Sequence, residues 1–170
     1  MNNREKNKKE TPDFIAIKKT YESLDNGPKA DIRRVGKPED LRLAPGFYRL
    51  RIKCSGKIEN IYDSQWKRIA FILPHAGHSD GGPSLGQALH LHERVAEARV
   101  FQVTRSRYPN DLIQLRRLCV YVKPTVDWQK LGETLYYWGD EQKRKLMEDF
   151  YLGEKKQQAL KNQEENNSHG

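Results

Sequence analysis

The sequence predicts an all-α fold, a compact bundle of roughly eight helices arranged either as one bundle or as two small lobes. Apolar residues recur at helical spacing in several segments, and N-capping residues, prolines and glycines separate these segments. Alternating apolar and polar residues between hairpin turns do not occur, so strands are not expected. The 170 residues suit one helical domain, expected over residues 11–152, with polar unstructured tails at residues 1–10 and 153–170.

The first half of the chain contains helix signals interrupted by turns. Thr11 is a good N-cap residue with a proline directly after it, and apolar residues then repeat at helical spacing as far as Leu24. Gly27 and Pro28 end this helix. The further helices expected in this half cover residues 29–35 and 62–73, and the loops cover residues 53–60 and 74–83.

The second half of the chain carries longer apolar stripes. Ser84 is an N-cap residue for a short helix. Trp128 and Trp138 lie on one stripe at helical spacing, and Phe150 lies on the stripe of the last helix, so we expect all three side chains to be structural. The longer helices expected in this half cover residues 94–104, 111–122 and 128–138, with a last helix up to residue 152.

The helix expected at residues 111–122 gives its two adjacent arginines different roles. Its apolar residues fall on one arc of a helical wheel, and Arg116 lies within this arc. We therefore expect Arg116 to be buried and paired with a carboxylate or with backbone carbonyls. Arg117 falls on the opposite side, where its charge can contact a phosphate.

The net charge of +8 favours a polyanionic partner. Arginine suits phosphate because its guanidinium is a rigid bidentate donor. For the last helix the alternative stays open that Arg144 pairs with Glu148, and Lys145 with Glu141, on the helix surface. The candidate nucleic-acid-binding residues are Arg33, Arg34, Arg68, Arg99, Arg105, Arg107, Arg117, Lys143 and Arg144.

Catalytic and metal-binding signatures are weak in this sequence. The histidines in the body of the chain form two clusters, His75 with His78 and His90 with His92, but neither cluster has the four convergent ligands that a zinc or iron site needs. We therefore expect no bound metal and no enzymatic activity. The glycines before Ser84 could offer backbone N–H groups to a phosphate, although a plain loop before a helix is the simpler interpretation.

The remaining signals concern the cellular compartment. Cys54 and Cys119 are far apart in the sequence and form no disulfide framework. The N-terminus lacks the apolar stretch of a signal peptide, and no segment is apolar enough over a sufficient length to span a membrane. We expect a cytoplasmic protein that needs no cofactor and contacts no membrane.

Several short motifs in a fixed order resemble the CasB-type small subunit of the type I-E CRISPR Cascade effector complex. The resemblance runs from about residue 14 to residue 152 and rests on the order and spacing of the motifs together. The motifs are Leu24-Asp25-Asn26-Gly27, Ile32-Arg33-Arg34-Val35, Phe47-Tyr48-Arg49-Leu50, Ser84-Leu85-Gly86 with Ala88-Leu89, Arg99-Val100-Phe101-Gln102, Gln114-Leu115-Arg116-Arg117-Leu118, Asp127-Trp128, Trp138-Gly139 and Glu148-Asp149-Phe150.

The resemblance implies an all-helical, non-catalytic subunit of a crRNA-guided interference complex. Such a subunit stabilises the guide–target R-loop and the displaced DNA strand on a basic face. The implied partners are the large subunit and the backbone subunits of Cascade, a second copy of this chain, the crRNA and both strands of the target DNA. The family's basic positions correspond to Arg34, Arg68, Arg99, Arg105 and Arg117.

Two alternatives of other classes remain open on the residues alone. One is a helical DNA-binding regulator, which needs base-reading side chains at the start of a recognition helix. The helix at residues 111–122 begins Asp-Leu-Ile, which suits that role poorly. The other is a metal-dependent enzyme that uses the histidines.

Overall fold

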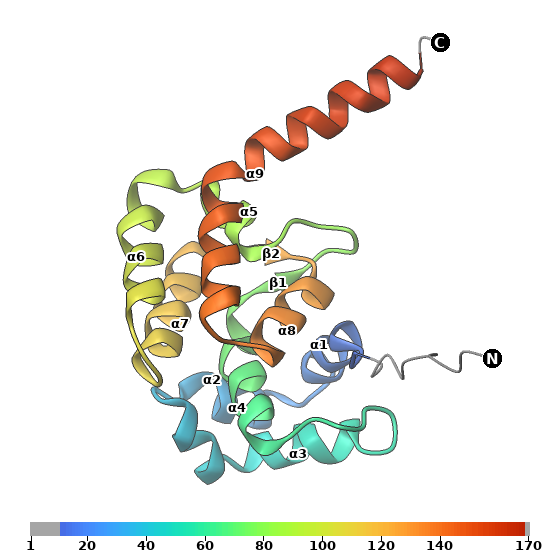
Figure 1. Ribbon diagram of the computed structural model, residues 1–170. Coiled ribbons are helices and arrows are strands. Elements are labelled where there is room, and N and C mark those ends of the chain that lie inside the picture. The colour runs from blue at the N-terminus through green and yellow to red at the C-terminus, as the bar shows by residue number, and fades with distance from the viewer. Residues whose placement is uncertain (1–10, 169–170) are drawn as a thin grey trace, which may run out of the picture.

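The described part of the chain is built almost entirely of helices, which confirms the predicted all-α class (Figure 1). The computed structural model describes residues 11–168, except for the side chains of residues 93–95, 154–158 and 160. The N-terminal tail expected at residues 1–10 lies outside the described residues. The elements are α1 (Phe14–Glu22), α2 (Asn26–Arg34), η1 (Pro38–Leu43), α3 (Pro45–Cys54), α4 (Asp63–Ile72), η2 (Leu73–His75), β1 (Gly77–His78), α5 (Leu85–His90), α6 (Glu93–Arg105), α7 (Asn110–Val122), β2 (Thr125–Val126), α8 (Trp128–Tyr136) and α9 (Asp140–Asn167), where η marks a 3₁₀ helix.

The helix starts follow the capping residues in most places. Ser84 caps α5 as predicted, and its hydroxyl and the Gln87 side chain each satisfy the other residue's backbone N–H. At α1 the cap is Asp13 rather than Thr11, because the Asp13 carboxylate accepts the N–H of Ala16 at 2.9 Å. The expected helix at residues 62–73 is α4, which begins one residue later and continues into the 3₁₀ turn η2.

A two-stranded parallel sheet joins the loop after η2 to the loop after α7. Gly77 pairs with Thr125, and His78 pairs with Val126. The sequence interpretation expected no strands, since two residues are too few to show alternation. The sheet fixes the start of α8, because the N–H of Trp128 donates to Nδ1 of His78 at 3.0 Å.

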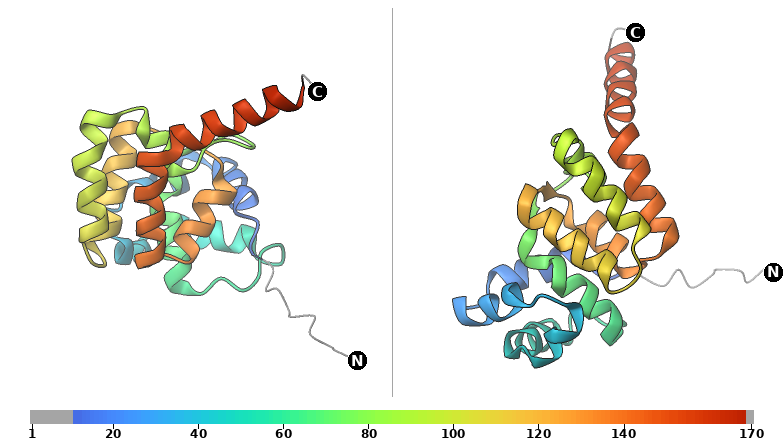
Figure 2. Two further views of the ribbon diagram at one scale, coloured as in Figure 1. Left: turned by 45° about the horizontal axis from the view of Figure 1, so that its top comes forward. Right: turned by 90° about the vertical axis from the view of Figure 1, so that its left-hand side faces the viewer.

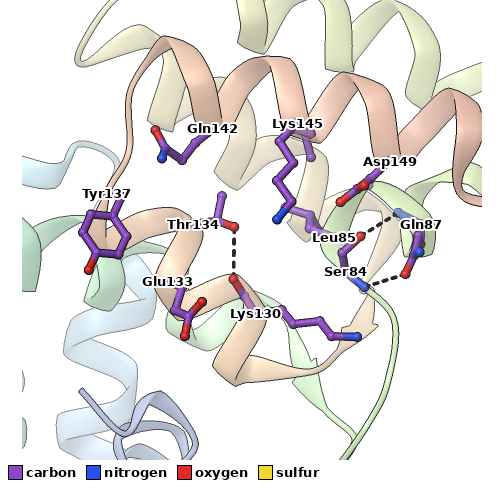
Figure 3. Close-up of a pocket in the computed structure, with 12 residues that line it drawn as sticks. Ser84, Leu85, Gln87, Lys130, Glu133, Thr134, Tyr137, Gln142, Lys145 and Asp149 are labelled. Carbon is purple, nitrogen blue, oxygen red and sulfur yellow. Dashed lines mark hydrogen bonds between the residues drawn. The ribbon is translucent and has the colours of Figure 1, made fainter. Parts of the chain in front are cut away.

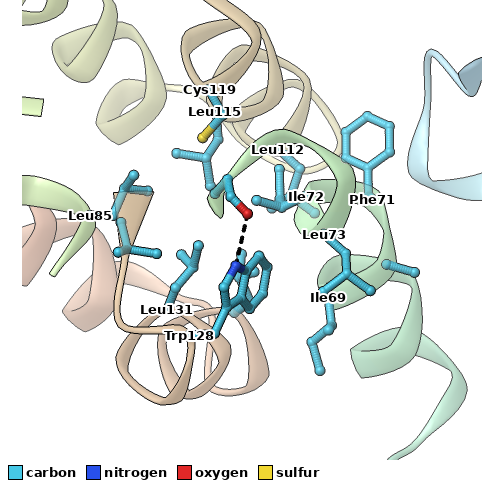
Figure 4. Close-up of a cluster of buried hydrophobic side chains, with 14 of the residues drawn as sticks. Ile69, Phe71, Ile72, Leu73, Leu85, Leu112, Leu115, Cys119, Trp128 and Leu131 are labelled. Atoms are coloured by element: carbon cyan, nitrogen blue, oxygen red, sulfur yellow. Dashed lines mark hydrogen bonds between the residues drawn. The ribbon is translucent and has the colours of Figure 1, made fainter. Parts of the chain in front are cut away.

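The core is one connected cluster of buried apolar side chains that reaches from α1 to α9, so the chain folds as a single bundle. Trp128 is completely buried, and its indole Nε1 donates to the carbonyl of Ala76 at 2.9 Å (Figure 4). Phe150 of α9 is also buried, with 2% of its surface exposed. The structural role predicted for these two aromatic residues is confirmed.

The last helix is longer than expected. The sequence interpretation ended it before Gly153 and treated residues 153–170 as an unstructured tail, whereas α9 continues to Asn167 and projects away from the body (Figures 1 and 2). Residues 154–167 are rich in Glu, Lys, Gln, Ala and Leu, which favour helix, and Gly153 does not end the helix. Gly153 is buried where α9 passes α5, and a Cβ there would lie 2.7 Å from Cγ of Gln87. This glycine permits close approach within a continuing helix.

Candidate nucleic-acid interface

Helices α6 and α7 pack side by side (Figure 2). Leu112, Leu115 and Leu118 of α7 are fully buried, which confirms the predicted apolar arc. Arg117 is exposed, as expected, whereas Arg116 is only partly exposed. The two adjacent arginines therefore differ in environment in the predicted sense.

Arg116 is held by the fold. Its Nη2 donates to the backbone carbonyl of Arg33 at 2.9 Å, and its guanidinium carbon lies 5.6 Å from the centre of the Phe71 ring. Burial lowers the pKa of Arg116, and the neighbouring charge of Arg117 lowers it further. Arginine nevertheless stays charged at neutral pH. Of the two partners predicted for Arg116, the structure shows a backbone carbonyl.

A hollow of about 400 Å³ opens between α6 and α7. Three arginines line it, Arg99, Arg116 and Arg117, together with Val120 and Tyr121. The Arg99 guanidinium carbon lies 4.6 Å from the centre of the Tyr121 ring. We call these five residues the arginine hollow. It concentrates positive charge on an exposed, partly apolar surface.

A second hollow of about 580 Å³ shares Arg116 and Val120 with the first and extends towards α1 and η2. Arg33, His75 and Lys123 also line it. Burial, followed by the charges of Arg116 and two other basic residues, lowers the pKa of His75 to about 4. His75 is therefore neutral near pH 7, and the net positive charge of this second hollow comes from its arginines and lysines.

Two residues of this surface were missed as candidates in the sequence interpretation. Tyr121 lies four residues after Arg117 and so shares its face of the helix, but it is not among the candidate residues named from the sequence. Lys123 ends α7 in the left-handed conformation, with a φ of 50°. The backbone conformation that directs Lys123 towards the second hollow is not encoded in a recognisable pattern.

Four other predicted residues are exposed but do not line either hollow. Arg34 ends α2, and Arg107 lies in the loop between α6 and α7. Arg105 stacks on Phe101 of its own helix, with the guanidinium carbon 4.0 Å from the ring centre. Arg144 lines a groove between α6 and α9. Of the sequence-predicted residues, the structure thus brings Arg99 and Arg117 together at the arginine hollow, while Arg33 lines the second hollow.

Arg68 and Lys143 both make contacts within the fold, which favours a structural role over the phosphate contact expected of them. Nε of Arg68 donates to the carbonyl of Leu135 at 2.7 Å, and its Nη2 donates to the next carbonyl, so the guanidinium satisfies the end of α8. Lys143 is buried, with Nζ 3.0 Å from Oδ2 of Asp111 and 2.8 Å from the carbonyl of Ser106. The partners of both cations therefore belong to the fold itself.

The histidine clusters do not converge. Nδ1 of His78 accepts the N–H of Trp128, so its Nε2 carries the proton that is donated to Asp80 at 2.6 Å, and the ring is neutral in this arrangement. His90 donates from Nδ1 to the carbonyl of Phe150 at 2.8 Å. Among the described residues, no group of three or more His, Cys, Asp or Glu side chains is arranged to hold a metal ion.

None of the described helices is both long and apolar enough to cross a membrane.

The glycine-rich loop before α5 adjoins a third hollow, of about 350 Å³, between α5, α8 and α9 (Figure 3). Its lining balances two lysines against Glu133 and Asp149, so it has no excess of positive charge. The Ser84 hydroxyl already accepts the N–H of Gln87 at the start of α5. These contacts favour the plain loop over a phosphate site.

Comparison with known proteins gives concordant matches. Residues 29–151 match the family described as CRISPR-associated protein Cse2. The chain is 37% identical over 151 residues to the CRISPR system Cascade subunit CasB of Escherichia coli strain K12, and the match covers 82% of this chain and 93% of that relative. It is also similar to a chain in the crystal structure of E. coli Cascade bound to a PAM-containing double-stranded DNA target, with a TM-score of 0.76, 36% identity, and coverage of 84% of this chain and 97% of that chain.

Proposed function

The chain belongs to the Cse2 family of CRISPR-associated proteins, and from this premise we propose that it is a non-catalytic subunit of a Cascade-type complex. Within that complex it holds nucleic acid by the sugar–phosphate backbone. The guide–target R-loop and the displaced DNA strand are the ligands we propose. Its neighbours in the assembly are the large subunit, the backbone subunits and a second copy of the chain.

The observation that carries this proposal is the arginine hollow. It brings Arg99 of α6 and Arg117 of α7 to one exposed depression, beside Arg116, which is hydrogen-bonded to the Arg33 carbonyl. Guanidinium groups at fixed positions on rigid helices favour phosphate contacts, which position a strand without reading its sequence. In RNA-guided complexes sequence is read by base pairing, so a sequence-blind protein surface fits such a role.

The state of the histidines supports a structural rather than a catalytic role for them. His78 and His90 both make hydrogen bonds that join one element of the fold to another. His75 is neutral near pH 7 and partly buried against α7.

Two experiments test this function: co-purification of the chain with the other effector subunits, and restoration of target binding when the chain is added to a complex that lacks it. A tagged copy of the chain, expressed with the other effector subunits and a guide RNA, should co-purify with them and with a short RNA of defined length. A complex assembled without the chain should bind its DNA target more weakly, and adding the purified chain should restore binding. Recovery of the chain alone, or target binding that is the same with and without it, would argue against this function.

A further inference from the structure

The arginine hollow contains more than a phosphate needs. A phosphate is held by cations and N–H donors, yet the apolar part of this hollow comes from Val120 and Tyr121. Both are well exposed, with 44% of the surface of Val120 and 56% of that of Tyr121 accessible to solvent. The hollow therefore combines an aromatic side chain with a rim of positive charge.

The Tyr121 ring is held in place from one side. The guanidinium of Arg99 lies over it, 4.6 Å from the ring centre, at a distance typical of a cation–π contact. Arg99 comes from α6 and Tyr121 from α7, so this contact links the two helices. More than half of the tyrosine stays exposed beside this contact. A positioned, exposed ring between arginines is an arrangement that can receive a flat aromatic ligand.

We propose that the arginine hollow binds a nucleobase of a single strand, which stacks on Tyr121 while Arg99 and Arg117 hold the flanking phosphates. This inference rests on the proposed function and specifies its ligand as single-stranded nucleic acid. Bases in a duplex are stacked on each other and cannot lie against the ring. A single strand offers free bases, and stacking on an aromatic side chain is tolerant of sequence. The surface then prefers single strands over duplexes.

The test separates the base from the phosphates. The full-length chain is titrated against two fluorescent oligonucleotides of equal length and charge, a single-stranded oligothymidylate and an abasic strand. We expect the wild-type chain to bind the oligothymidylate about five-fold or more tightly than the abasic strand, since stacking contributes roughly 1 kcal/mol or more per base. Tyr121→Phe should keep this ratio, and Tyr121→Leu should reduce it to less than two-fold.

The salt dependence gives a second readout that a purely electrostatic role would not produce. Tyr121→Leu removes no charge, so its affinity for the oligothymidylate should fall without a change in the logarithmic salt slope. Arg117→Ala should weaken both oligonucleotides alike and reduce the slope. A wild-type chain that binds the two oligonucleotides equally, or a Tyr121→Leu variant that keeps the preference, would overturn the stacking.

The same variants distinguish failure of the stacking from failure of the proposed function. If Arg117→Ala weakens binding while Tyr121→Leu changes nothing, the surface holds phosphates and the base site is wrong. If neither variant alters binding, or the wild-type chain binds neither oligonucleotide, the arginine hollow is not the nucleic-acid interface. Both the proposed function of this surface and the proposed base stacking are then wrong. Both side chains are exposed, so melting temperatures close to wild type are expected and serve as the check on folding.

Discussion

Nη2 of Arg116 donates a hydrogen bond to the backbone carbonyl of Arg33 at 2.9 Å, and this contact ties α7 to the last turn of α2. The next residue, Arg117, is exposed on the outer face of α7. Arg116 is thus hydrogen-bonded within the fold, whereas the adjacent Arg117 is exposed to solvent. This division separates stability from binding and makes the two roles testable in one helix.

Replacing Arg116 by alanine should destabilise the protein. The change removes the hydrogen bond to the Arg33 carbonyl, and a hydrogen bond from a charged donor is worth about 1.5–3 kcal/mol. Urea unfolding of the purified chain measures the loss. Arg117→Ala is the matched control, and its free energy of unfolding should stay within about 0.5 kcal/mol of wild type. Destabilisation by the control and not by Arg116→Ala would mean that the two roles are reversed.

Breaking the pair of Asp111 and Lys143 should be costly. Nζ of Lys143 lies 3.0 Å from Oδ2 of Asp111, and both residues are buried. Removing one partner leaves the other charge buried and uncompensated, which costs about 3–5 kcal/mol. Lys143→Met and Asp111→Asn should each lower the free energy of unfolding, and the double variant should lose less than the sum. An additive double variant would show that the two side chains are not coupled.

Trp138 should matter for stability through its polar edge. Its indole Nε1 donates to the same Asp111 carboxylate, at 2.9 Å, and the ring is partly buried against the core. Trp138→Ala should cost about 3–5 kcal/mol, the range for truncation of a buried aromatic residue, or somewhat less because the ring is only partly buried. Trp138→Phe keeps an aromatic ring but removes the N–H donor, so its free energy of unfolding should lie between those of wild type and Trp138→Ala. Loss of nucleic-acid binding at an unchanged melting temperature would contradict this assignment.

Stability should depend on pH through His75. Its folded-state pKa is lowered to about 4, below the ordinary value of about 6.5, mainly by burial. The unfolded chain then binds this proton more readily, so the contribution of neutral His75 is complete above about pH 6.5 and is lost as the pH falls towards 4. The free energy of unfolding of wild type should fall between pH 7 and pH 4.5 by more than that of His75→Phe. Equal losses in the two proteins would exclude His75 as a source of the acid sensitivity.

The sequence was sufficient where local periodicity decides the structure. The apolar arc of α7 follows directly from helical spacing, and with it the outward direction of Arg117 and the inward direction of Arg116. The caps at Ser84 and the buried Trp128 follow from equally local signals.

Contacts between segments that are distant in the chain could not be predicted from the sequence. Lys143 looks like an exposed basic residue until Asp111, 32 positions earlier in the chain, is brought against it. Arg68 likewise gains its partners only when α8 packs on α4. The length of α9 was misjudged because Gly153 looked like a helix end, while its real constraint is the close approach of Gln87. For Lys143 and Arg68 tertiary packing decides the role, whereas beyond Gly153 the helix continues on the propensity of its Glu, Lys, Gln and Ala residues.

The most direct test of the central claim is the salt dependence of target binding by the assembled complex with Arg117→Ala. Arg117 is exposed on the arginine hollow, so its loss should remove one phosphate contact and leave assembly intact. The logarithmic salt slope should then shrink by about 0.7 if the contact is to a single strand, or by about 0.9 if it is to a duplex. Arg49→Ala, which removes an exposed arginine from α3, is the control and should leave the slope unchanged. A fully assembled Arg117→Ala complex with wild-type affinity and slope would contradict the claim that this face of α7 holds nucleic acid.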